Sequence, residues 1–210
     1  MKEYDFELKF SLPNTDADPE QILDALYEAG CDDAIVGLGI KGRVALNFTR
    51  EALSAQAAVK SAIANVTKAI PGAKLIEATP DYVGFSDIAD FVGCSRQNIR
   101  KVILNDTSAP IPVHSGTTAI WHLAKVLDWL KHKGAFKIDD RLIEMSLVTM
   151  KTNIEKEAKF FDHKKITRSH SVRNPRTGEI VRVKTSKTPA AFKTGAAAVG
   201  FGKKKSIRAT

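Results

Sequence analysis

A short polar run near the middle of the chain carries the side-chain types that bind DNA. It consists of Ser95, Arg96, Gln97, Asn98, Arg100 and Lys101. An Arg guanidinium can donate two hydrogen bonds to guanine, a Gln or Asn amide can pair with adenine, and Lys or Arg can bind phosphate. If the run lies on one helix, it predicts base and phosphate contacts. The alternative is an ordinary solvated helix face.

Two short helices are predicted around this run. Ser86 can cap a first helix that buries Ile88, Ala89 and Val92, and Gly93 supplies a tight turn. Ser95 can then cap a second helix, whose apolar residues Ile99, Val102 and Ile103 recur at helical spacing. Two short helices joined at a glycine predict a helix-turn-helix, with the polar run at the start of its second helix.

Residues 83–131 resemble the winged helix-turn-helix of the MerR and excisionase-like families. The resemblance rests on Ser86-Asp87-Ile88-Ala89, on Gly93-Cys94-Ser95, and on Asn98-Ile99-Arg100. It implies a wing over residues 110–121 with Ser115-Gly116 at its tip, so that His114, Ser115 and Thr117 would contact the DNA backbone. The apolar helix from His122 to Lys131 would close the core. The connection Leu104–Ala109 is longer than in the shortest members of these families.

A second basic motif lies near the C-terminal end of the sequence. It contains residues that are typical of a turn, Asn174-Pro175-Arg176-Thr177-Gly178. The segments on either side favour β-strands and carry interleaved basic residues, which predicts a positively charged hairpin. Residues 173–195 resemble the DNA-binding arm of the HU/IHF family. That resemblance implies that Pro175 wedges into a minor-groove base step. The residues that it places against the groove and phosphates are Arg173, Asn174, Arg176, Arg182, Lys184 and Lys187.

The HU/IHF resemblance covers the arm and the segment after it. Nothing in residues 81–160 is similar to the helices from which that family's arm grows. The alternative is therefore a disordered cationic tail that binds any polyanion. In either form, the segment would bind nucleic acid by releasing counterions, and its affinity would fall steeply with salt.

The charge of the chain is unevenly distributed along its 210 residues, whose net charge is +8. Residues 1–80 hold eight basic and twelve acidic side chains, a net charge of −4, and residues 81–160 are near neutral at +1. Residues 161–210 hold thirteen basic and two acidic side chains, a net charge of +11. Charge concentrated in one segment predicts a polyanionic partner for that segment.

Several function classes have no support in the sequence. There is no apolar run long enough to span a bilayer and no secretory leader pattern, which favours a cytoplasmic, nucleoid-associated protein without a membrane partner. Cys31 and Cys94 lack the spacing of a zinc site and are expected to be small core residues. No metal site, cofactor or catalytic motif is expected, so the chain is predicted not to be an enzyme.

The first eighty residues predict a separate module. Residues 4–12 alternate as a half-buried strand, a helix begins at Pro19, and residues 34–38 and 44–48 form a hairpin. A helix over 51–70 and a strand over 73–78 complete the order β-α-β-β-α-β, which is that of a ferredoxin-like sandwich. The acidic pair Asp32-Asp33 is expected on the solvated surface.

The prediction as a whole is an α+β protein in four parts. They are a ferredoxin-like assembly or partner module over 1–79, a winged helix-turn-helix over 80–134, a helix over 135–161 and a basic HU-like arm over 162–210. The helix carries an apolar stripe that could pack on the preceding domain or pair with a second copy. We expect a homodimer that binds double-stranded DNA as a transcriptional regulator or an architectural factor. The alternative is an adaptor or effector recruited to DNA, whose residues 1–79 bind a partner protein.

Overall fold

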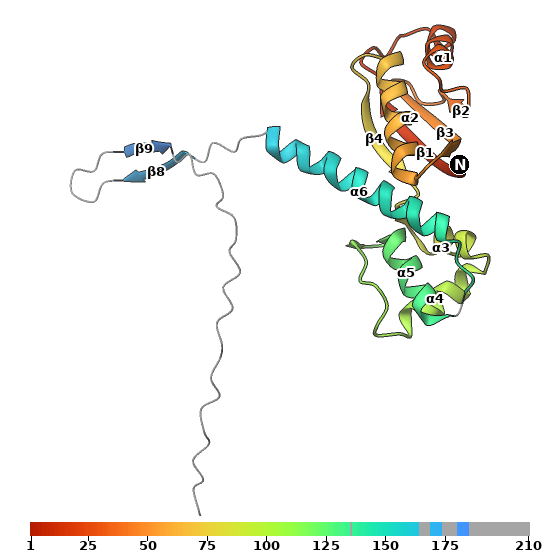
Figure 1. The fold of residues 1–210 in the computed structure, drawn as a ribbon. Coiled ribbons are helices and arrows are strands. Elements are labelled where there is room, and N and C mark those ends of the chain that lie inside the picture. The colour runs from red at the N-terminus through yellow and green to blue at the C-terminus, as the bar shows by residue number, and fades with distance from the viewer. Residues whose placement is uncertain (135, 164–168, 174–179, 185–210) are drawn as a thin grey trace, which may run out of the picture. The chain divides into compact units, whose positions relative to one another are not determined.

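The computed structural model describes residues 1–134, 136–163, 169–173 and 180–184. The described residues up to His163 belong to one compact unit, and the strands at 169–173 and 180–184 belong to a second. Helices and antiparallel sheets occur together in the first unit, so the predicted α+β class is confirmed (Figure 1).

The N-terminal part of the first unit contains a four-stranded sheet in the order β2-β3-β1-β4. Its elements are β1 (Lys2–Ser11), α1 (Pro19–Glu28), β2 (Ala34–Gly37), β3 (Arg43–Ala52), α2 (Ala55–Ala69) and β4 (Lys74–Thr79). Each neighbouring pair is antiparallel, and the two central strands align Phe6 with Phe48 and Leu8 with Leu46. This register places the apolar residues of β1 and β3 on one face of the sheet.

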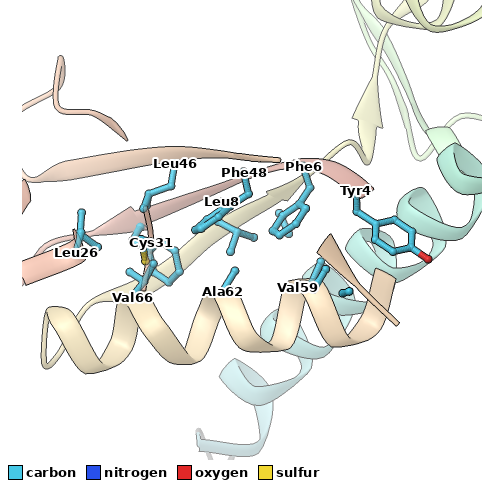
Figure 2. Packing of buried hydrophobic residues seen from close by; sticks show 14 of the residues in the cluster. Tyr4, Phe6, Leu8, Leu26, Cys31, Leu46, Phe48, Val59, Ala62 and Val66 are labelled. Atoms are coloured by element: carbon cyan, nitrogen blue, oxygen red, sulfur yellow. The ribbon is translucent and has the colours of Figure 1, made fainter. Parts of the chain in front are cut away.

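The core of this part lies between that face and the helices. Tyr4, Phe6, Leu8 and Phe10 are all buried, which confirms the predicted alternation. The side of α2 that meets them carries small residues, among them Ala58 and Ala62, so the helix can approach the sheet closely (Figure 2). Cys31 lies in the same core, as expected.

Two details of the N-terminal part differ from the prediction. The helix expected over 51–70 begins only at Ala55, because β3 remains paired with β1 as far as Ala52 and Ser54 caps α2 through a 3.2 Å hydrogen bond from the Ala57 N–H. The acidic pair is also not simply solvated surface. Asp33 accepts hydrogen bonds of 2.6 and 2.7 Å from the guanidinium of buried Arg50, because a buried cation needs a partner.

The second half of the unit is mainly helical, with a small three-stranded sheet in the order β5-β7-β6. Its elements are β5 (Tyr82–Val83), α3 (Phe85–Val92), α4 (Arg96–Leu104), β6 (His114–Ser115), β7 (Ala119–His122) and α5 (Leu123–Lys133). Ile88, Ile99, Trp121, Leu127 and Leu130 form the centre of its core, and Cys94 is partly buried against it.

The long helix α6 (Asp140–His163) joins the two halves of the unit. It contacts α2, β1 and β4 on one side of the junction and α5 on the other. Glu144 accepts a 3.0 Å hydrogen bond from the Tyr4 hydroxyl and a 2.9 Å bond from the Ala55 N–H. Burial, and then the bond to Glu144, raises the pKa of Tyr4. Two roles were expected for this helix. Its packing on the preceding domain is confirmed by its contacts with α5, and its pairing with a second copy stays a prediction.

Within the described residues, no helix is both long enough and apolar enough to cross a bilayer.

Candidate nucleic-acid interface

Local hydrogen bonds fix the turn between α3 and α4. Gly93 ends α3 with φ +69°, a left-handed conformation that glycine adopts without strain. Ser95 then caps α4, because its Oγ accepts a 3.2 Å hydrogen bond from the Asn98 N–H. The predicted cap at Ser86 is wrong. Gly84 is the N-cap of α3, its N–H donates to the Asp87 carboxylate over 2.7 Å, and Ser86 lies within the first helical turn.

The structure brings the predicted polar run together on the exposed side of α4. That run comprises Ser95, Arg96, Gln97, Asn98, Arg100 and Lys101, and every one of these residues is exposed. We call them the α4 face. On the opposite side of the helix, Ile99 and Ile103 are buried in the core, so the helix cannot rotate without losing that burial. Within the described part of the chain, no ion pair involves the three cations of the α4 face.

A short hairpin lies at the position predicted for the wing. Its strands β6 and β7 pair His114 with Ile120 and Ser115 with Ala119, and the Val113 N–H donates to the Ile120 carbonyl over 2.8 Å. Ser115 is therefore a strand residue, and the tip lies at Gly116, Thr117 and Thr118 rather than at Ser115-Gly116. The three predicted contact residues of this hairpin, His114, Ser115 and Thr117, are all exposed.

An open groove of about 760 Å³ separates the α4 face from the hairpin. Arg96 and Arg100 line it from the helix, and Ser115 and Thr117 line it from the hairpin. Trp121 belongs to the same lining. It is 3% exposed, its ring centroid lies 4.8 Å from that of Phe85, and its Nε1–H donates to the Pro110 carbonyl over 3.0 Å. Guanidinium and hydroxyl groups therefore border one space, and buried Trp121 forms part of its wall.

The two carboxylates that line this groove are both used internally. Asp106 pairs with Lys133 and accepts hydrogen bonds from the Ser108 N–H at 2.8 Å and the Ser108 Oγ at 2.6 Å. The hydrogen bond from Lys133, followed by those from Ser108, lowers the pKa of Asp106 to about 2. Asp87 accepts from the Gly84 N–H. Neither acid cancels Arg96 or Arg100, so the groove can attract an anion.

A buried polar network lies at the junction of the two halves of the unit, and the sequence did not predict it. His122 Nδ1 lies 2.6 Å from Asp81 Oδ1, and the Asn153 side chain donates to Asp81 Oδ2 over 2.8 Å. The Asp81 carbonyl accepts from the Leu123 N–H over 2.7 Å, at the start of α5. Asp81, His122 and Asn153 are all buried. They are 41 and 72 positions apart, so no local sequence signal could have grouped them.

The basic C-terminal residues are described only in part. β8 (Ser169–Arg173) pairs antiparallel with β9 (Ile180–Lys184), and the register aligns Arg173 with Ile180, Arg182 with Ser171 and Lys184 with Ser169. The two strands thus flank the predicted turn. The remaining predicted contact residues, Asn174, Pro175, Arg176 and Lys187, lie outside the described residues.

Comparison with known proteins gave no further evidence about this site. No protein-family model, no curated protein and no solved structure matches the chain.

Proposed function

We propose that this chain is a non-catalytic protein that binds double-stranded DNA through a winged helix-turn-helix, attached to a ferredoxin-like module. The observation that carries the proposal is the α4 face beside the exposed hairpin. Three cations and two amides project from a capped helix whose other side is buried, and hydroxyl groups border the same groove. The strand order β2-β3-β1-β4 with two crossover helices supports the ferredoxin-like assignment.

The dimensions of an α-helix match this mode of binding. A helix with its side chains is about 10–12 Å across, which fits a major groove about 12 Å wide. In the proposed complex, the α4 face enters the major groove, where Gln97 and Asn98 meet base edges. Arg96 and Arg100 lie nearer the hairpin and bind the phosphates that pass along the groove between them. The exposed hydroxyls of Ser115 and Thr117 bind the same backbone.

The basic C-terminal unit adds attraction that does not depend on sequence. Residues 161–210 carry a net charge of +11, and the paired strands β8 and β9 support a hairpin arm. In this proposal the arm contacts the minor groove, with Pro175 as its wedge, and the protein associates with the nucleoid. Each phosphate contact releases counterions, so most of the salt dependence of binding comes from this unit.

Measuring duplex DNA affinity against salt concentration tests the proposal. The double variant Gln97→Ala, Asn98→Ala should remove the preference among sequences, while Ser95 still caps α4 because its partner is the backbone N–H of residue 98. A chain that ends at Phe161 should bind all sequences more weakly, with a shallower salt slope. Lys125→Ala, on an exposed position of α5, is the matched control and should change neither property.

Two results would contradict this function. If the double variant kept its full sequence preference, the α4 face would not read bases. If the shortened chain kept the salt slope of the full chain, the C-terminal unit would not bind DNA.

A further inference from the structure

A second large groove lies away from the α4 face, between α2, the outer edge of β4 and α6. It measures about 1100 Å³, and apolar side chains from all three elements line it, among them Ile63, Leu75 and Leu147. Leu147 is 48% exposed, although it follows directly on a stretch of α6 that is buried. An apolar surface of this size beside a sheet edge indicates a binding site for another segment of protein.

Next to this groove and at its border, side chains of α6 already bind backbone groups at the edge of β4. The Asn153 side-chain oxygen accepts from the Ala78 N–H over 2.9 Å, and its amide donates to the Ala78 carbonyl over 2.8 Å. The Lys156 ammonium donates to the Ile76 carbonyl. Side chains of α6 thus use the outward backbone groups that strand addition would need. An added strand would have to displace these contacts, so the groove suits a helix better than a strand.

The rim of the groove specifies the charge of that helix. Five lysines line it, Lys60, Lys74, Lys151, Lys156 and Lys159, against two carboxylates. Glu155 pairs with Lys151 at 3.8 Å and Glu157 with Lys156 at 3.0 Å, so the rim keeps a net charge of +3. A helix that suits this rim carries apolar residues beside a row of carboxylates and has few basic residues.

Helix α1 of this same chain has these properties. Residues 16–33 contain seven acidic and no basic side chains. Within α1, Leu23 and Tyr27 are one turn apart and are 42% and 71% exposed. Glu20, Asp24 and Glu28 are also exposed and form the adjoining row at four-residue spacing. The chain therefore exposes both an acidic amphipathic helix and a basic apolar groove.

We infer that α1 of a second copy of this chain docks in the groove between α2, β4 and α6. A chain cannot fill its own groove, because Ile22 and Leu26 hold α1 in its own core. The contact is consequently heterologous: each bound pair retains one free α1 and one free groove, so copies add head to tail. This inference concerns the protein without DNA and does not depend on the proposed DNA-binding function.

Sedimentation velocity of the full chain without DNA, over a range of protein and salt concentrations, tests this docking. The full chain should associate beyond a dimer at low salt. Asp24→Lys with Glu28→Lys should weaken association by about tenfold or more, and so should Lys60→Glu with Lys74→Glu, because each reversal replaces attraction between the two copies by repulsion. Combining all four substitutions should restore association to within about threefold of the original.

Further variants make the outcome decisive. Tyr27→Ser should also weaken association, since it removes apolar contact without changing charge. Glu51→Lys, at an exposed position of β3, controls for the change of net charge and should leave association unchanged. The inference is overturned if the full chain stays monomeric at all concentrations, if it stops at a salt-independent dimer, or if the fourfold variant fails to recover while circular dichroism shows it folded. In these cases the groove would serve a different protein.

Discussion

Replacing Asn153 by Leu should destabilise the first unit strongly while leaving its shape nearly unchanged. Asn153 is fully buried and makes three hydrogen bonds: two with the Ala78 backbone and one with the Asp81 carboxylate. Leucine has the same number of side-chain heavy atoms in the same branched arrangement, so it leaves no cavity. The lost hydrogen bonds therefore dominate, with a smaller cost from the larger methyl groups. The substitution therefore measures what the polar network contributes between α6 and β4.

The magnitude follows from the groups that lose their partner. The N–H and carbonyl of Ala78 are buried at the sheet edge, and each costs about 1–3 kcal/mol if it is left without a hydrogen bond. Asp81 keeps His122 on its other oxygen, so its loss is about one charged hydrogen bond, or 1.5–3 kcal/mol. Allowing for relaxation and for water entry, we expect a total loss of about 4 kcal/mol in the free energy of unfolding.

Urea unfolding followed by circular dichroism measures this loss. The matched control is Glu155→Leu, two positions further along α6, where the side chain is exposed and its pair with Lys151 spans 3.8 Å. The control should change the free energy by no more than about 0.5 kcal/mol. A loss below about 1 kcal/mol for Asn153→Leu, at an unchanged m-value, would refute the assignment of this network as the joint between α6 and β4.

Three further changes test other features of the fold. Arg50→Met should cost about 2–4 kcal/mol in urea unfolding, because it leaves the Asp33 carboxylate without its cation, whereas exposed Arg43→Met should cost little. Gly93→Ala should lower the free energy of unfolding by about 1–2 kcal/mol, because φ +69° strains an L-residue even though no atom crowds the added Cβ. Gly93→Asn should cost less, because Asn tolerates this conformation better. Asp106→Asn should destabilise the fold at pH 7 but not near pH 2. The folded pKa of Asp106 is lowered from 3.8 to about 2, so its stabilising effect is complete above about pH 4 and is lost as the pH falls through 2, which pH-dependent thermal unfolding measures.

Features of the fold that follow from local periodicity were predictable. Alternation from Tyr4 to Leu12 places β1 and its buried face, and Gly93 with Ser95 fixes the turn and the start of α4. The start of a helix could not be predicted where two nearby residues can both serve as its N-cap. Ser86 has the chemistry of an N-cap, yet Gly84 takes that position because Asp87 reaches back to its N–H.

Features that depend on contacts between distant residues could not be predicted. The exposure of the α4 face is not one of these features, because the helical spacing of Ile99 and Ile103 already indicates which side of α4 is buried. The pairing of Asp106 with Lys133, in contrast, brings together residues 27 positions apart and only the folded chain reveals it. The same holds for Asp33 with Arg50, where a carboxylate that looked solvated serves a buried guanidinium.

The two proposals together predict that the opposite charges on α1 and on the groove between α2, β4 and α6 couple assembly to DNA binding. The carboxylates of residues 16–33 repel phosphate when they are free. Once α1 is docked against the lysines of a neighbouring copy, those carboxylates are neutralised, so the neighbour can approach the same duplex at lower electrostatic cost. DNA in turn holds bound copies at a high local concentration, which favours docking. Because such a coupling is reciprocal, we expect DNA binding to promote assembly by the same factor by which assembly promotes DNA binding, and added salt to weaken both.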